Sequence, residues 1–154
     1  MRVAGAEALR IVRVDAPGPG ALPPGLRVSA ETVHRQLRPH LETDYLSQMA
    51  RILAGGAGMI LAVADERVLG LAVFRVFENT HAGQRFYVDD LVTDADARST
   101  GVGAAMLAWL EAEARTRGCG SVELESGSQR TRAHRFYFRE GFLITGFGFR
   151  KALP

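Results

Sequence analysis

The sequence predicts an α/β fold in which one mixed β-sheet carries helices on both faces. Segments with the two-residue alternation of strands are interleaved with segments of helical periodicity, in the expected order β, α, α, β, β, β, α, β, α, β. The chain has 154 residues, with 47% apolar and 23% charged residues, which suits one globular domain. We therefore expect a single domain over residues 1–154, built as a sheet covered by helices.

The N-terminal third of the chain is expected to form one strand and two helices. Apolar and basic residues alternate over 7–16 and predict the first strand. A loop follows at 17–25, where proline and glycine are too frequent for a regular element. Residues 28–56 contain two helical stretches, with Ser29 as a possible N-cap and Pro39 between them.

The middle of the chain is expected to form three consecutive strands. Residues 59–77 read as two strands joined by a turn at Asp65–Glu66–Arg67, and Gly70 marks a possible bulge in the second. Residues 84–93 form the next strand, which is rich in β-forming side chains.

The C-terminal third alternates between helices and strands. An apolar stripe predicts a helix over 101–117, and the strand at 121–126 then completes a right-handed parallel crossover with the strand at 84–93. A helix at 130–140 and a last strand at 142–151 are expected to end the fold.

Composition argues against several classes of protein. No apolar run approaches the roughly 18 residues of a membrane helix, and the N-terminus lacks the hydrophobic segment of a signal peptide. Cys119 has no cysteine with which to pair, which favours a cytoplasmic location. The net charge is only +2, and the aromatic residues near the basic clusters follow core spacing rather than forming a stacking platform, so a small anionic ligand is favoured over nucleic acid. The histidines show no metal-site spacing.

The segment DARSTGVGAAML, residues 96–107, has two glycines and few bulky side chains between a strand and a helix, so its backbone is accessible. A helix N-terminus presents free amide hydrogens and attracts phosphate, and glycines at 101 and 103 keep the approach open. The glycines could equally serve only the turn. The segment is neither a P-loop nor a complete dinucleotide fingerprint, since Met106 stands where the third glycine would be.

The stretch DDLVTDADARSTGVGAAML resembles the acyl-CoA-binding signature of the GCN5-related N-acetyltransferase (GNAT) family. AHRFYFREGF, residues 133–142, is similar to the family's second signature, although Arg130 stands where an asparagine is common. The resemblance implies that the exposed strand backbone pairs with the pantetheine arm at Leu91, Val92 and Thr93. It also implies a diphosphate site in the following loop: Arg98, Ser99, Thr100, Gly101, Val102, Gly103 and Ala104.

Three side chains are candidates for the chemistry of acyl transfer. The resemblance makes Tyr137 the acid that protonates the departing thiolate; the alternative is that its ring only packs the helix on the sheet. Asp89 and Asp90 are candidates for the base or the amine anchor, because carboxylates are costly inside an apolar strand. Neighbours on a strand point to opposite faces, so at most one faces the substrate unless a bulge intervenes. The alternative is an ion pair with Arg75 or Arg85.

The function that these features predict is direct transfer of an acetyl group from acetyl-CoA to a primary amine, without a metal or a covalent intermediate. The acceptor is expected to be a small molecule or a peptide, with acidic groups favouring a cationic amine. No nucleic acid or membrane partner is expected, and a homodimer is possible. The alternatives are a non-catalytic acyl-CoA sensor or partner module of the same fold and a polyanion-binding protein built on the arginine clusters.

Overall fold

The computed structural model describes residues 7–14 and 21–154, and it contains one five-stranded sheet with the strand order β1-β2-β3-β4-β5. The first four strands are antiparallel to their neighbours. The strands are β1 Arg10–Val14, β2 Gly58–Ala64, β3 Arg67–Asn79, β4 Gly83–Thr93 and β5 Val122–Leu124. The helices are α1 Arg27–Leu37, α2 Tyr45–Ala54, α3 Val102–Thr116 and α4 Thr131–Arg139, with short 3-10 turns η1 Pro24–Leu26 and η2 Ala95–Ala97.

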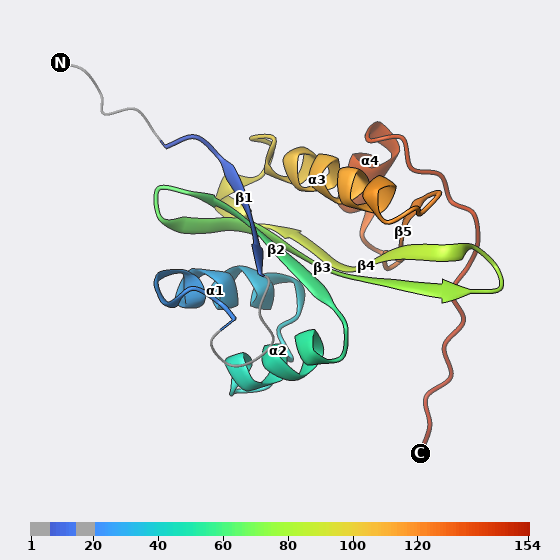
Figure 1. Ribbon diagram of the computed structural model, residues 1–154, viewed down its shortest axis with the longest axis horizontal. Coiled ribbons are helices and arrows are strands. Elements are labelled where there is room, and N and C mark those ends of the chain that lie inside the picture. The colour runs from blue at the N-terminus through green and yellow to red at the C-terminus, as the bar shows by residue number, and fades with distance from the viewer. Residues whose placement is uncertain (1–6, 15–20) are drawn as a thin grey trace. The chain divides into compact units, whose positions relative to one another are not determined.

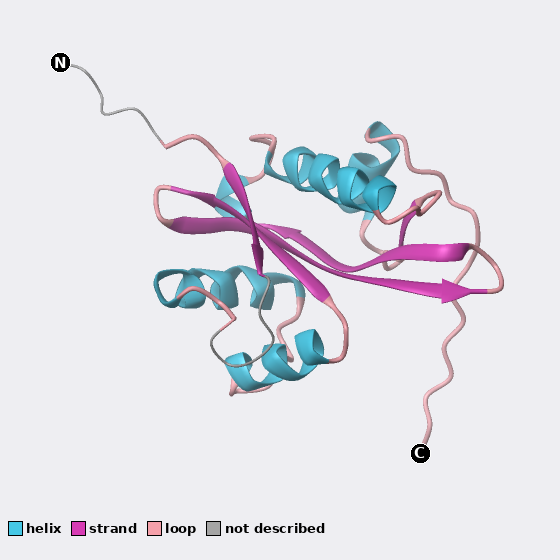
Figure 2. Cartoon of the chain, viewed as in Figure 1, coloured by secondary structure: helices cyan, strands magenta, loops and turns pink. Residues whose placement is uncertain are grey.

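The chain divides into two compact units, the first ending at Glu123 and the second spanning Leu124–Pro154. In the first unit, α1 and α2 cover one face of the sheet and α3 covers the other (Figure 1). Colouring by secondary structure shows the strands as the middle layer of this unit (Figure 2). The mixed sheet with helices on both faces, predicted from the sequence, is confirmed.

Apolar side chains fill both interfaces of the sheet. Beneath α1 and α2, a buried cluster joins residues such as Val33 and Met49 to the strand residues Leu71 and Val73. On the α3 face, Phe74 stacks on Phe86 with the ring centroids 4.9 Å apart. The β3–β4 hairpin is therefore held from both sides, except near its tip.

Two local features of the first half differ in detail from the expectations. Ser29 does not cap a helix: α1 begins at Arg27, and the Ser29 hydroxyl lies within its first turn, where it donates to the Leu26 carbonyl. The expected bulge falls one residue earlier than Gly70, because Ala62 pairs with Gly70 while Val63 pairs with Val68. The first expected strand and the following loop extend partly outside the described residues.

The tight turn between β2 and β3 lies where it was predicted. Asp65 and Glu66 both have positive φ angles, 49° and 56°. Left-handed residues at both central positions match the twist of a two-residue hairpin, so the turn fixes the register of β2 on β3.

The second unit contains α4 and a C-terminal segment. The Tyr137 ring of α4 is buried and lies 5.6 Å from the Phe142 ring, centroid to centroid. The prediction of a strand at 142–151 is wrong, because residues 142–154 are irregular in the structure. Alternation alone does not make a strand, since its backbone groups need a partner strand. The apolar side chains of the segment are exposed: Leu143, Ile144, Phe147, Phe149 and Leu153.

Candidate active site

A bulge in β4 places two carboxylates side by side. Phe74 pairs with Val88 and Val73 pairs with Asp90, so Asp89 is an extra residue without a partner in β3. Asp90 lies opposite Val73, on the α1 face of the sheet, and Asp89 bonds Arg75, which shares that face with Val73. The bulge therefore brings both aspartates to one face, which a regular strand would forbid.

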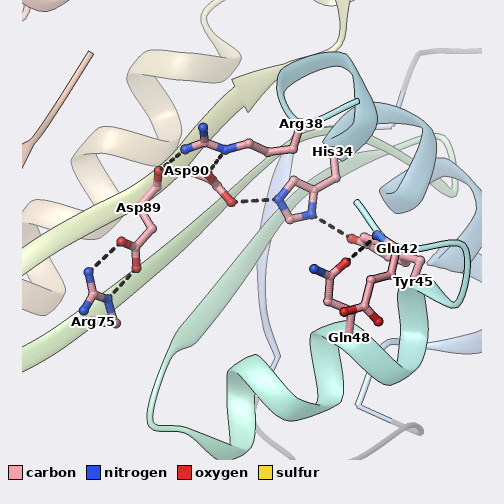
Figure 3. Close-up of polar contacts among 8 residues, drawn as sticks. All are labelled: His34, Arg38, Glu42, Tyr45, Gln48, Arg75, Asp89 and Asp90. Carbon is pink, nitrogen blue, oxygen red and sulfur yellow. Dashed lines mark hydrogen bonds and ion pairs between the residues drawn. The ribbon is translucent and has the colours of Figure 1, made fainter. Parts of the chain in front are cut away.

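Asp90 ends a buried chain of hydrogen bonds that reaches from β4 to α2 (Figure 3). His34 Nε2 lies 2.8 Å from Asp90 Oδ2, and His34 Nδ1 lies 3.0 Å from the Tyr45 hydroxyl. An ionised carboxylate only accepts, so His34 Nε2 donates to Asp90, and Nδ1 is placed to accept from the Tyr45 hydroxyl. Burial raises the pKa of Tyr45, which keeps this hydroxyl protonated.

Arg38 links the second Asp90 oxygen to the bulge itself. Its Nε donates to Asp90 Oδ1 at 2.7 Å, and its Nη2 donates to the main-chain carbonyl of Asp89 at 3.0 Å. Burial alone would raise the pKa of Asp90, but the hydrogen bonds from His34 and Arg38 outweigh it and lower that pKa. Both carboxylate oxygens of Asp90 are thus engaged by protein donors.

Asp89 is the more accessible of the two carboxylates. Arg75 donates to it in bidentate fashion, from Nε at 2.7 Å and from Nη2 at 2.8 Å. The Asp89 side chain remains 31% exposed against 14% for Asp90. Each oxygen of an ionised carboxylate accepts more than one hydrogen bond, so Asp89 keeps acceptor capacity toward solvent.

The end of β4 turns part of its backbone away from β3. The Asp94 amide donates to the Leu69 carbonyl, and Val92 pairs with Leu71. The backbone N–H and C=O groups of residues 92 and 94 therefore point toward β3. Alternation in an antiparallel ladder then directs the N–H and C=O groups of Leu91 and Thr93 to the opposite edge of β4. That edge has the hydrogen-bonding groups that an added strand requires.

The loop after β4 opens the N-terminus of α3. Ser99 and Gly101 have positive φ angles of 64° and 91°, and no side chain caps the helix. The first hydrogen bond of the helix is from the Ala105 amide to the Gly101 carbonyl. The amides before Ala105 therefore have no partner within the helix, so they suit an anion there: Val102, Gly103 and Ala104.

Other residues of the loop hold its shape. Thr100 donates from its hydroxyl to the Ala97 carbonyl at 2.6 Å. Asp94 accepts from Gln36 and Arg67 at the start of the loop. Arg98 is exposed, where its charge is available to an anion.

Tyr137 lies in α4 of the second unit. Burial raises the pKa of Tyr137, although the positive charge of Arg130 partly opposes this. A phenol of raised pKa keeps its proton at neutral pH, as a general acid must. Arg130 itself is exposed at the N-terminus of α4.

Sequence reasoning found the aspartates but missed the groups that hold Asp90. His34, Arg38 and Tyr45 lie 45 to 56 positions before it, and no spacing rule joins residues so far apart. The ion pair considered for the aspartates exists between Arg75 and Asp89, whereas Arg85 pairs with Glu123 at 2.7 Å.

Comparison with known proteins identifies the family. The model of the acetyltransferase (GNAT) family matches residues 26–142. The chain belongs to the GNAT family. The predicted family and the predicted class of enzyme, an N-acetyltransferase, are confirmed.

Curated relatives and solved structures agree with this assignment. An uncharacterised N-acetyltransferase of Bacillus subtilis, YhdJ, is 37% identical over 75% of this chain and 84% of its own length. The aminoalkylphosphonate N-acetyltransferase of Salmonella typhimurium is 37% identical over 60% of this chain and 61% of its own. The aminoglycoside N-acetyltransferase AAC(6')-Iy in complex with CoA has a TM-score of 0.77 at 16% identity, with 99% of this chain and 100% of that chain covered.

Two classes of feature are missing from the part of the chain that the structure describes. Within residues 7–14 and 21–154, no helix combines the length and apolar character needed to cross a bilayer. The same residues contain no group of three or more His, Cys, Asp or Glu side chains placed to hold a metal ion.

Proposed function

We propose that this GNAT protein transfers the acetyl group of acetyl-CoA directly to the primary amine of a small acceptor. The observation that carries the proposal is the continuity of β4 from the bulge at Asp89, through the outward-facing groups of Leu91 and Thr93, to the open amides of α3. One strand thus joins a candidate amine site to a candidate diphosphate site.

The cofactor fits the residues along this path. The backbone of Leu91, Val92 and Thr93 would receive the pantetheine arm as an added strand. The loop would hold the diphosphate through its amides and the charge of Arg98: Ser99, Thr100, Gly101, Val102, Gly103 and Ala104. Acetyl-CoA supplies the thioester.

The acceptor amine would be drawn to Asp89 in this proposal. Asp90 has both oxygens occupied, so we assign it to shaping the bulge, and we assign Asp89, directly or through a water, to binding and deprotonating the ammonium group. The amine nitrogen then attacks the acetyl carbonyl, the carbon–sulfur bond breaks, and Tyr137 gives its proton to the thiolate. The new amide nitrogen loses one proton, and the Tyr137 phenolate takes up one proton, so the step balances. The relatives' names include a small aminophosphonate and an aminoglycoside as acceptors, which supports a small amine.

The proposal also covers the setting of the enzyme. A cytoplasmic location follows from the supply of acetyl-CoA there and from the lone Cys119, which is a free and buried thiol. A homodimer would cover the exposed apolar side chains of residues 143–153. The proposal keeps residues 1–154 as a single N-acetyltransferase domain.

Calorimetric titration with acetyl-CoA tests the cofactor first, with ATP as the comparison ligand. We expect acetyl-CoA to bind and Gly103→Val to weaken binding by blocking the approach to the helix amides. Release of free thiol from acetyl-CoA in the presence of an amine panel then tests turnover, and Tyr137→Phe should lower kcat with little change in acetyl-CoA affinity. Binding without turnover on any amine would favour the non-catalytic sensor, and no binding would refute both.

A further inference from the structure

We infer that the acceptor carries an anionic group besides its amine, and that an arginine–aromatic patch on the β3–β4 hairpin binds that group. The patch consists of Arg75 and Phe77 of β3 and Arg85 and Tyr87 of β4. This inference rests on the proposed function and narrows its acceptor to small zwitterions.

The four patch residues share one face of the hairpin. Arg75 pairs with Tyr87 and Phe77 pairs with Arg85 across the strands, and residues two apart in a strand point the same way. Each arginine therefore has one aromatic ring beside it on its own strand and another opposite it on the partner strand. The guanidinium carbon of Arg85 lies 4.7 Å from the Tyr87 ring centroid, and that of Arg75 lies 5.5 Å from it. These contacts hold both guanidinium groups in place.

The patch continues into the candidate amine site. Arg75 is both a patch residue and the bidentate partner of Asp89. Because the bulge turns Asp89 and Asp90 to this same face, Tyr87 lies between the Arg85 guanidinium and the carboxylate of Asp89. An acceptor that spans from Arg85 to Asp89 would place its two ends near opposite charges.

Both aspartates of the candidate amine site already have an arginine partner. Arg38 pairs with Asp90 and Arg75 pairs with Asp89, while Arg85 pairs with Glu123 at the other end of the patch. A site for a polycation has a surplus of carboxylates, because each ammonium group that leaves water needs compensation. Carboxylates that are already paired with arginines offer less compensation to a polycation than to an acceptor that brings its own anionic group. This inference favours a zwitterionic acceptor over the cationic amine that the acidic residues alone suggest.

Arg85 retains the donors that an anion needs. It reaches Glu123 through Nε alone, and among the described residues no hydrogen bond is formed by its Nη1 or Nη2 groups. Its side chain is 28% exposed and lies against the Phe77 and Tyr87 rings, so it is partly removed from water. A carboxylate or phosphonate accepts two parallel hydrogen bonds from such a guanidinium edge.

Matched acceptors test the inference. Thiol release is measured with 2-aminoethylphosphonate, β-alanine and taurine against propylamine and ethanolamine, which lack the anion, and against spermidine. A charged hydrogen bond contributes roughly 1.5–3 kcal/mol, so kcat/KM should favour the zwitterions by about tenfold to a hundredfold. Equal rates for propylamine, or the highest rates for spermidine, would overturn the inference and leave the N-acetyltransferase proposal intact.

Variants at Arg85 test the assigned contact. Arg85→Gln should lower kcat/KM for the zwitterions by about tenfold or more, mostly through KM, and leave the anion-free amines unchanged. Arg85→Lys keeps the charge and should restore part of the loss. Arg115→Gln is the matched control, because Arg115 forms an exposed ion pair with Glu111 one turn away on α3. Equal losses on both acceptor classes at unchanged melting temperature would overturn the contact.

The two proposals fail in different ways. If acetyl-CoA does not bind, the proposed function fails. If acetyl-CoA binds and anion-free amines are acetylated as fast as zwitterions, only the zwitterion inference fails.

Discussion

Replacing His34 by leucine tests the buried chain Tyr45–His34–Asp90. His34 and Tyr45 are 1% and 2% exposed, so neither recovers a lost hydrogen bond from water. The leucine keeps apolar volume but leaves the Tyr45 hydroxyl without its acceptor and removes one of the two side chains that donate to Asp90. A buried unsatisfied polar group costs about 1–3 kcal/mol, and a hydrogen bond to a charge contributes a similar amount. We expect His34→Leu to lower the free energy of unfolding by about 3 kcal/mol.

A double-mutant cycle separates the two hydrogen bonds of His34. Tyr45→Phe removes the hydroxyl and should cost about 1–2 kcal/mol, because His34 Nδ1 then lacks its donor. In the His34→Leu background the same change removes an already orphaned hydroxyl, so it should cost close to nothing or stabilise the protein. Urea unfolding at pH 7 measures all four species, and the coupling should be at least about 1 kcal/mol.

The exposed His40 provides the control for this cycle, since His40→Leu should change stability by less than about 0.5 kcal/mol. Additive effects of the His34 and Tyr45 changes would refute the continuous chain. So would a His34→Leu protein as stable as the parent.

Three further outcomes follow from the structure. Because the pKa of Asp90 is lowered in the folded protein, its stabilising contribution is complete above the unfolded-state pKa near 4 and is lost as the pH falls through the lower folded-state pKa. Urea unfolding from pH 7 to pH 2.5 should show this loss of stability, and Asp90→Asn should reduce the loss. Gly70→Val should destabilise by about 1–3 kcal/mol in thermal melts, because a Cβ there would lie 2.8 Å from Met106 Cε; an unchanged melt would contradict this packing. The proposed homodimer predicts that Phe147→Ser with Phe149→Ser lowers the molecular mass in size-exclusion chromatography with light scattering from that of a dimer to that of a monomer. A parent protein that is already monomeric, or a double variant that stays dimeric, would remove the C-terminal segment from any interface.

Most of the first unit could be predicted because its signals are local. The positive-φ turn at Asp65 and Glu66 lies between two alternating apolar runs, and each strand of that hairpin is recognisable by itself. The glycines at 101 and 103 likewise mark the start of α3 within one residue. Such features depend on neighbours in the chain, which a single sequence displays.

The features that could not be predicted depend on distant partners. The family resemblance implies a bulge in this strand, but its position at Asp89 is defined by the missing partner in β3, and the sequence of β4 by itself reads as an unbroken strand. His34 looks like any helical histidine until α1 is packed on the sheet and Asp90 lies opposite. The segment at 142–151 shows the opposite case, in which a strand-like pattern has no partner in the structure.

The bulge of β4 is an addition to a hairpin that is otherwise complete. If Asp89 were deleted, Val88 and Asp90 would become neighbours that still pair with Phe74 and Val73, and the alternation of the ladder would be unbroken. The hairpin would keep its pairing after deletion of Asp89, but it would lose the more accessible of the two carboxylates. Scaffold and chemistry are thus separable here, because a single extra residue in β4 supplies the second acidic group on this face.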